Sequence, residues 1–295
     1  MSEAAKSVSR ETPAAPGRIS QRFAELAERG ELGLVAYLTA GDPTLAASEE
    51  IVLAAAEAGA DVIELGVPFS DPMADGPIIQ RASERALRSG TTLAGVLQLA
   101  ARLRLKTEVP LVLFTYFNPI LQAGLENFAR DAATAGVDGV LVTDLTPEEA
   151  DEYRAAIRSR GLDTIFLAAP TSTDARLSLI AAATTGFLYV ISRTGVTGVR
   201  DALPEDLPAL VRRARVATRL PIAVGFGISL PTHVSVLGGI ADAAVVGSAI
   251  VAQVEKAATT KEAADSVREL IRTLKRAARA GVSRRGSELG GGQTT

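Results

Sequence analysis

Short apolar segments alternate with helical segments along most of this chain. Three segments, at residues 58–64, 135–141 and 238–246, resemble one another: each closes an Ala-rich helix with Gly, turns on Asp and then begins an apolar run. Repeated strand–helix–strand units require right-handed parallel crossovers, and eight such units close into a barrel. An open doubly wound sheet is the alternative. The candidate strands are Gly33 to Thr39, Val62 to Leu65, Leu111 to Tyr116, Gly139 to Thr143, Thr164 to Leu167, Phe187 to Ile191, Pro221 to Gly225 and Ala243 to Gly247.

The segments between these strands have helical patterns. Examples are Leu45 to Ala58, Leu93 to Leu105, Pro147 to Arg160 and Leu207 to Thr218. A further amphipathic segment, Ile19 to Arg29, precedes the first strand, and we expect it to cover the bottom of the barrel. The sequence therefore predicts one α/β domain over residues 18–283, a (β/α)8 TIM barrel with an extra N-terminal helix. Residues 1–17 and 284–295 are predicted to be disordered tails.

Composition excludes several classes of function. The net charge of −3 gives no global attraction to nucleic acid or anionic lipid. The chain has no Cys, so it has no disulfide, thiolate zinc site or Cys nucleophile, and its single histidine, His233, cannot form a His-rich metal site. We interpret His233 as structural and predict no metal. Residues 1–17 lack the apolar run of a signal peptide or membrane span, so we expect a cytoplasmic protein.

Two carboxylates lie at the end of the second strand and in the loop beyond it, within residues 64–77. Strand alternation places Val62 and Glu64 on one face, which predicts that Glu64 points into the core. A buried carboxylate is costly unless it is paired, hydrogen-bonded or protonated, and enzymes use such sites as general acids or bases. The alternative is a Glu satisfied by backbone donors. Asp75 precedes a Gly, which is also ordinary turn chemistry.

Glycines gather after the last three strands, where phosphate commonly binds in barrels. They are Gly195 and Gly198 after the sixth strand, Gly225 and Gly227 around the end of the seventh, and Gly247 before Ser248 at the end of the eighth. Glycine lets a phosphate approach the backbone N–H groups, and Ser248 adds a hydroxyl. Each glycine alone is compatible with a simple turn. Together they favour an anion site, although no Walker-type nucleotide motif is present.

Several motifs resemble the tryptophan synthase alpha chain family. They are residues 39–43 (Thr-Ala-Gly-Asp-Pro), 64–77 (Glu-Leu-Gly-Val-Pro-Phe-Ser-Asp-Pro-Met-Ala-Asp-Gly-Pro), 116–119 (Tyr-Phe-Asn-Pro), 189–198 (Tyr-Val-Ile-Ser-Arg-Thr-Gly-Val-Thr-Gly), 225–229 (Gly-Phe-Gly-Ile-Ser) and 246–250 (Val-Gly-Ser-Ala-Ile). They occur in the family's order. The resemblance implies retro-aldol cleavage of indole-3-glycerol phosphate to indole and glyceraldehyde 3-phosphate, without a cofactor in this chain.

The resemblance also implies residue roles. Glu64 would be the acid and base, Asp75 would accept a hydrogen bond from the indole N–H, and Thr197 would meet Asp75 when the loops close. The phosphate would be bound by Gly198, Gly227, Gly247 and Ser248. The indole pocket combines residues that alternation turns inward with positions carried over from the family, namely Tyr37, Phe114, Tyr116, Leu141, Thr143, Leu167, Tyr189, Thr197 and Phe226. Simple core packing remains the alternative for each aromatic residue.

The resemblance further implies a partner, a pyridoxal-phosphate beta chain in an alpha2beta2 tetramer. The exposed loops around Asp71-Pro72, residues 116–119 and residues 144–147 form a candidate contact rim. Three other functions stay open: a sugar-phosphate epimerase, which commonly needs metal-binding His; the synthase that forms indole-glycerol phosphate, which needs a strand-end Lys absent from all eight candidate strands; and a catalytically silent scaffold that activates the beta chain.

Overall fold

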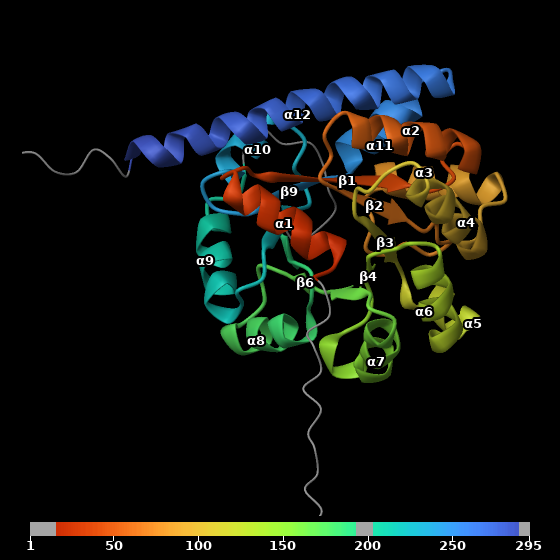
Figure 1. Cartoon of the computed structure of the whole chain (residues 1–295), viewed down its shortest axis with the longest axis horizontal. Coiled ribbons are helices and arrows are strands. Elements are labelled where there is room, and N and C mark those ends of the chain that lie inside the picture. Colours follow the sequence, from red (N-terminus) through yellow and green to blue (C-terminus); the bar gives the residue numbers. More distant parts are fainter. Residues whose placement is uncertain (1–15, 193–202, 289–295) are drawn as a thin grey trace, which may run out of the picture.

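The computed structural model describes residues 16–192 and 203–288 and has a nearly closed barrel of parallel strands (Figure 1). The strand order is β5-β4-β3-β2-β1-β9-β8-β7-β6. The two strands at the ends of this order, β5 and β6, are consecutive in the chain and are separated only by Phe166, so they together form the predicted fifth strand. The strands are β1 (Gly33–Thr39), β2 (Val62–Gly66), β3 (Leu111–Thr115), β4 (Gly139–Val142), β5 (Asp163–Ile165), β6 (Leu167–Ala168), β7 (Leu188–Ile191), β8 (Ile222–Gly225) and β9 (Ala243–Val246). The barrel prediction is confirmed, and the open sheet is wrong.

Helices surround the strands. They are α1 (Arg18–Glu28), α2 (Leu45–Glu57), α3 (Pro77–Arg88), α4 (Leu93–Arg104), α5 (Phe117–Ala123), α6 (Leu125–Thr134), the 3-10 turn η1 (Pro147–Glu149), α7 (Asp151–Ser159), α8 (Asp174–Ala183), α9 (Leu207–Ala217), α10 (Pro231–Leu237), α11 (Ser248–Lys256) and α12 (Thr260–Glu288). The predicted helix Pro147 to Arg160 is thus broken at Ala150. Helix α12 packs along α2 and α10 and runs beyond residue 283, where we predicted the domain to end. The extent of the domain stays a prediction.

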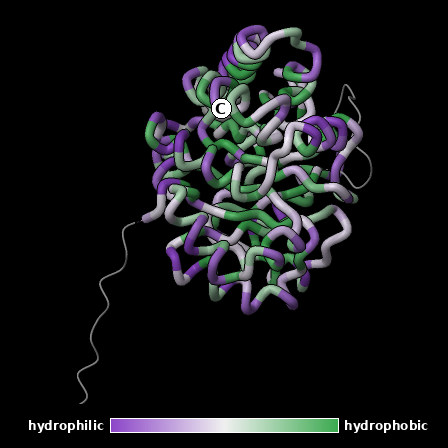
Figure 2. The backbone as a smooth tube through the Cα atoms, turned by 90° about the vertical axis from the view of Figure 1, so that its right-hand side faces the viewer, coloured by the Kyte–Doolittle hydropathy of each residue, from purple (hydrophilic) through white to green (hydrophobic). Residues whose placement is uncertain are grey.

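Strand alternation divides the buried residues into two cores. Side chains such as Val35, Val62, Val112 and Val245 belong to a cluster inside the barrel. Their neighbours along each strand belong to a larger cluster between the strands and the helices. Hydrophobic residues accordingly concentrate along the central strands, whereas the outer helices carry more hydrophilic residues (Figure 2). Both faces of a barrel strand are buried, as the almost continuous apolar runs predict. None of the helices in the described residues is long and apolar enough to cross a membrane.

Helix α1 covers the bottom of the barrel as predicted. Its buried face consists of Ile19, Phe23 and Leu26. The ring of Phe23 lies 5.6 Å from that of Phe187 between centroids, and Ile19 and Leu26 approach the first residues of β4 and β1. The interior core is therefore closed at this end, so a ligand has to enter from the opposite end.

The Asp of each of the three repeats clamps the bottom edge of the barrel. Asp138 donates its backbone N–H to the carbonyl of Leu111 and accepts the Leu111 N–H on Oδ2, both at 2.8 Å. Asp61 pairs in the same way with Leu34, and Asp242 with Ile222. Each Asp thus joins the start of its own strand to the start of the preceding one. These residues do more than form the predicted turns.

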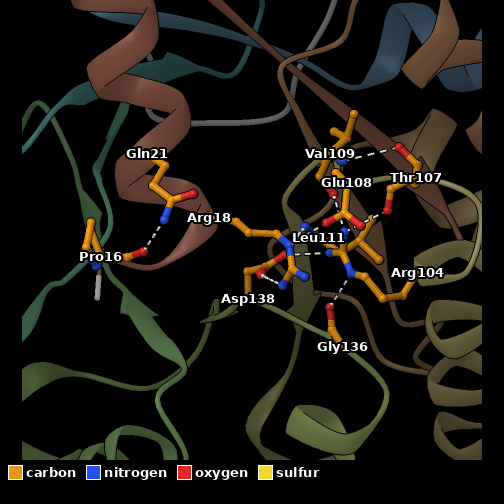
Figure 3. Close-up of polar contacts among 10 residues, drawn as sticks. All are labelled: Pro16, Arg18, Gln21, Arg104, Thr107, Glu108, Val109, Leu111, Gly136 and Asp138. Atoms are coloured by element: carbon orange, nitrogen blue, oxygen red, sulfur yellow. Dashed lines mark hydrogen bonds and ion pairs between the residues drawn. The ribbon is translucent and has the colours of Figure 1, made fainter. Parts of the chain in front are cut away.

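Basic side chains pair with each of these carboxylates, of which those of Asp61 and Asp138 are buried and that of Asp242 is partly exposed. Asp138 lies between Arg104, at 2.7 Å, and Arg18, at 3.2 Å (Figure 3). Lys275 of α12 contacts Asp61, and Arg215 of α9 contacts Asp242. A buried charge needs such pairing, because an unpaired one would be strongly destabilising. Ion pairs therefore stabilise the bottom of the barrel. The opposite end is where a catalytic site is expected in this fold.

Candidate active site

Glu64 is a buried carboxyl group that forms no ion pair with any residue the structure describes. It lies on β2, next to Tyr37 of β1 and Val112 of β3 in the strand register, and points to the interior with 0% of its surface exposed. Neither carboxyl oxygen has a hydrogen-bond partner among the described residues. Burial raises the pKa of Glu64 to about 8. The backbone-satisfied alternative is therefore wrong, and Glu64 is protonated at neutral pH.

Asp75 lies in the loop that follows β2 and is fixed from the end of β3. The Tyr116 hydroxyl donates to Asp75 Oδ2 at 3.1 Å and accepts the N–H of Ala74 at 3.0 Å. The Tyr116 ring also stacks on Phe69, with centroids 4.9 Å apart. Gln80 of α3 also donates to the carbonyl of Asp75 at 2.9 Å, so the loop is held over the barrel mouth by Tyr116 and Gln80 together. Burial raises the pKa of Asp75 to about 6, and the hydrogen bond from Tyr116 limits this rise.

The two carboxyl groups consequently have different protonation states at pH 7. Glu64 retains its proton, whereas Asp75, with a pKa of about 6, is mostly ionised. Environments that separate the pKa values of two neighbouring acids are typical of an acid paired with a charge-stabilising carboxylate. The arrangement is suited to a reaction that needs a proton at one point of a substrate and a negative charge at another.

Both carboxyl groups line one cavity of about 820 Å³, including its open mouth. Aromatic and aliphatic side chains form most of the wall, and glycines and serines form one side. Of the predicted site residues, the wall includes Tyr37, Glu64, Asp75, Phe114, Tyr189, Phe226, Gly227, Gly247 and Ser248. A flat apolar ring with a polar tail fits such a wall.

The polar side of the cavity is built from a strained turn and a helix start. Phe226 and Gly227 both have positive φ, 66° and 86°, and a bulky residue adopts this conformation rarely. The Ser192 hydroxyl donates to the carbonyl of Phe226 and holds the turn. Gly247 precedes α11, whose first residues, Ser248 and Ala249, also line the cavity. The first N–H groups of a helix lack intrahelical acceptors, so this side favours an anion.

Some predicted residues lie elsewhere. Leu141 is fully buried in the interior core, Leu167 packs against that core, and the Thr143 hydroxyl donates to the carbonyl of Thr115. None of these three lines the cavity formed by the described residues. Tyr116 does not line the cavity either, but its hydroxyl is hydrogen-bonded to Asp75, which does. Gly195, Thr197 and Gly198 lie outside the described residues.

Sequence reasoning missed several wall residues, namely Gly76, Ile78, Ile79, Ile228, Ser229, Val245, Ala249 and Ala252. Val245 could have been found, because it lies two residues before Gly247 on the same face of β9. Ile78 and Ile79 lie in the first turn of α3, directly after the Asp75 loop. Their position relative to Glu64 depends on how that loop folds back, which local periodicity does not show.

Comparisons with known proteins agree with this geometry. A family model described as tryptophan synthase alpha chain matches residues 23–279. This chain belongs to the tryptophan synthase alpha chain family. The tryptophan synthase alpha chain of Solibacter usitatus is 53% identical over 259 residues, covering 88% of this chain and 97% of that protein. The one of Citrifermentans bemidjiense is 58% identical over 239 residues, covering 81% and 90%.

Solved structures show the same likeness. A chain of Mycobacterium tuberculosis tryptophan synthase is 36% identical, with a TM-score of 0.83, and the match covers 90% of this chain and 99% of that one. The tryptophan synthase alpha chain family consists of lyases that cleave indole-3-glycerol phosphate to indole and glyceraldehyde 3-phosphate in tryptophan biosynthesis. Membership implies a beta-chain partner. It decides against the epimerase and synthase alternatives.

Proposed function

We propose that Glu64 transfers the protons in the cleavage of indole-3-glycerol phosphate and that Asp75 stabilises the charge on the indole. The observation that carries the proposal is the buried Glu64 carboxyl, which faces the cavity without a hydrogen-bond partner among the described residues and keeps its proton at neutral pH. A neutral acid of this kind is ready to donate, and no salt bridge has to be broken first.

The cleavage requires two proton movements that balance. Indole C3 accepts a proton from the Glu64 carboxyl, so the ring becomes a cation and the bond from C3 to the glycerol carbon weakens. The hydroxyl on that carbon then returns a proton to the Glu64 carboxylate, the carbon becomes the aldehyde of glyceraldehyde 3-phosphate, and the bonding electrons return to the ring. Glu64 ends the reaction protonated, so one residue serves as both acid and base.

Asp75 accepts a hydrogen bond from the indole N–H in this proposal. The positive charge of the protonated ring is shared by its nitrogen, so an ionised carboxylate there stabilises the transition state more than the ground state. The Tyr116 hydroxyl supports this role because its hydrogen bond favours the ionised form of Asp75. Its neighbour Ala74 is held by the same hydroxyl, which orients the loop.

The rest of the cavity positions the substrate. We assign the phosphate to Gly227, Gly247 and Ser248, where α11 begins, together with Gly198 outside the described residues. The indole ring is assigned to the apolar wall. The edge-to-face contacts of Tyr37 with Phe114 and of Tyr189 with Phe226 shape this wall, with centroids 5.2 and 6.0 Å apart. Leu141, Thr143 and Leu167 support the pocket from behind, and the contact of Thr197, outside the described residues, with Asp75 stays a prediction.

We further propose that the chain assembles with its beta chain as an alpha2beta2 tetramer in the cytoplasm. In this assembly the beta chain alone carries pyridoxal phosphate, since the proton transfers assigned to Glu64 need no cofactor. The contact rim around residues 71–72, 116–119 and 144–147 stays a prediction. It includes Tyr116, so docking there would act directly on the residue that holds Asp75.

The test is steady-state release of indole by Glu64→Gln, with and without a beta chain. We expect turnover to fall by about three or more orders of magnitude, because the sole proton donor is lost, while ligand binding persists. Glu152→Gln, on the exposed surface of α7, is the matched control and should keep full activity. Near-normal turnover of Glu64→Gln would refute the assignment. An intact chain that releases no indole in either condition would instead support the silent scaffold.

A second variant tests the phosphate site. Gly247→Asp places a carboxylate beside the start of α11, where it would crowd and repel a phosphate. We expect weaker inhibition by inorganic phosphate and a higher KM for the substrate. Unchanged affinity for both would count against the anion site without affecting the role of Glu64.

A further inference from the structure

The single histidine of the chain holds the turn that forms the polar side of the cavity. His233 lies on α10 with 2% of its surface exposed, and its Nδ1 accepts the backbone N–H of Ser229 at 3.3 Å. A ring nitrogen that accepts a hydrogen bond carries no proton, so the ring proton is on Nε2. The interpretation of His233 as structural is therefore incomplete, because its hydrogen bond ends at a residue of the cavity wall.

Ser229 has an unused hydroxyl at that wall. Its Oγ is buried and has no hydrogen-bond partner among the described residues. Buried hydroxyl groups normally make at least one hydrogen bond, so an unpaired one beside a cavity needs an explanation. A phosphate oxygen of the substrate would supply an acceptor. Ser229 lines the cavity together with Gly227, Gly247 and Ser248, which already form its polar side.

The hydrogen bond to His233 determines which group of Ser229 faces a ligand. The backbone N–H is occupied by Nδ1, so only the hydroxyl is free to donate into the cavity. The strained turn is fixed at both ends, by Ser192 at the carbonyl of Phe226 and by His233 at the N–H of Ser229. With both ends fixed, the turn cannot relax from the positive φ of Phe226 and Gly227.

We propose that the Ser229 hydroxyl is an additional ligand of the substrate phosphate and that His233 is the positioning residue that aims it. The inference rests on the proposed phosphate site and adds a side-chain donor from the loop after β8, which lines the same cavity as the start of α11. Ser229 and Ser248 would then donate to the phosphate from two different loops, after β8 and after β9.

The experiment uses the full chain and two probes, inorganic phosphate as an inhibitor and indole as a ligand without phosphate. Ser229→Ala should weaken phosphate inhibition about tenfold, the typical effect of losing one hydrogen bond to a charged group, and leave indole affinity unchanged. KM for the substrate should rise with kcat nearly constant. Ser235→Ala is the matched control, because this serine lies on α10 with His233 and its hydroxyl donates to the carbonyl of Ala277 instead.

Two variants of His233 separate positioning from packing. Asn places its amide oxygen where Nδ1 lies, so His233→Asn should keep phosphate inhibition within about twofold, whereas His233→Leu should weaken it like Ser229→Ala. Equal effects of Asn and Leu would overturn the positioning role, and unchanged phosphate inhibition in Ser229→Ala would overturn the ligand role. If His233→Leu does not fold, Ser229→Ala still decides the ligand role, and a loss of phosphate inhibition in His233→Asn, which keeps the acceptor, would overturn the positioning role.

Comparing Gly247→Asp with Ser229→Ala shows whether a negative result concerns the role of Ser229 or the phosphate site itself. If Gly247→Asp weakens phosphate inhibition and Ser229→Ala does not, the site exists and the role of Ser229 is wrong. If neither variant changes phosphate inhibition, the phosphate is bound elsewhere and both proposals fail.

Discussion

Replacing Glu64 by Gln should change how the stability of the chain depends on pH. Burial raises the pKa of Glu64 from 4.5 to about 8. Below pH 4.5 the carboxyl is protonated in the folded and the unfolded chain, so it has no effect on the pH dependence. Between pH 4.5 and 8 the unfolded chain loses this proton and the folded chain keeps it. The free energy of unfolding therefore falls as the pH rises, by about 1.4 kcal/mol per pH unit from this residue.

The magnitude follows from the two pKa values. At pH 7 the loss is about 3 kcal/mol, and above pH 8, where the carboxyl is ionised in both states, it stops growing at about 5 kcal/mol. Glu64→Gln removes this titration. The difference in free energy of unfolding between variant and parent should therefore increase in favour of the variant from pH 5 to pH 8 and then level off.

Urea unfolding followed by circular dichroism at pH 5, 6, 7, 8 and 9 measures this difference. Any constant cost of burying the Gln amide cancels, because only the slope against pH is compared. Glu152→Gln shows what the loss of a surface carboxyl does alone. A difference between Glu64→Gln and the parent that stays constant from pH 5 to 9 would mean that Glu64 keeps an ordinary pKa in the folded chain. The reasoning about its protonated state would then be wrong.

Other parts of the structure give predictions of the same kind. Tyr116→Phe removes the hydrogen bond to Asp75, so the pKa of Asp75 should rise and the acid limb of the kcat/KM profile should move up by about one pH unit; an unmoved limb would contradict this. Gly225→Ala would place a methyl carbon 2.1 Å from the Tyr189 hydroxyl oxygen, so urea titrations should show a loss of about 1–3 kcal/mol and indole affinity should weaken. Asp138→Ala leaves Arg104 unpaired at the barrel bottom and should cost about 3 kcal/mol with kcat/KM unchanged; loss of activity in the folded variant would show that the two ends are coupled.

Most of the fold could be predicted from the sequence because the strands are short and apolar and most of them follow a helix that ends in Gly. Alternation also separated the interior face of the strands from the outer face, which is why Glu64 was expected to point inward. The break at Phe166 could not be predicted, since the run from Asp163 to Ala168 is continuous in the sequence. It reflects pairing with β4 at one end and with β7 at the other.

The clamping role of the three Asp residues was missed for a different reason. The partner of Asp138 is the backbone N–H of Leu111, 27 residues away, and turn propensity does not report on such a contact. The recurrence of Asp at the same place in three repeats was the available signal. A residue that is needed only for its own turn has no reason to recur at one end of the barrel, whereas a residue that joins neighbouring strands does.

The position of each carboxyl group in the fold explains why the two acids differ. Glu64 is on a strand and neither of its carboxyl oxygens has a hydrogen-bond partner among the described residues, so burial is what raises its pKa. Asp75 is on a loop and is reached by the Tyr116 hydroxyl at the end of the neighbouring strand, so a donor offsets part of its burial. A phenylalanine at position 116 would leave burial as the main influence on both groups and bring their pKa values closer together. Glu64 on the strand thus supplies the proton and Asp75 on the loop supplies the negative charge. The hydrogen bond from the Tyr116 hydroxyl keeps the pKa of Asp75 below that of Glu64, which allows the two residues to have different roles.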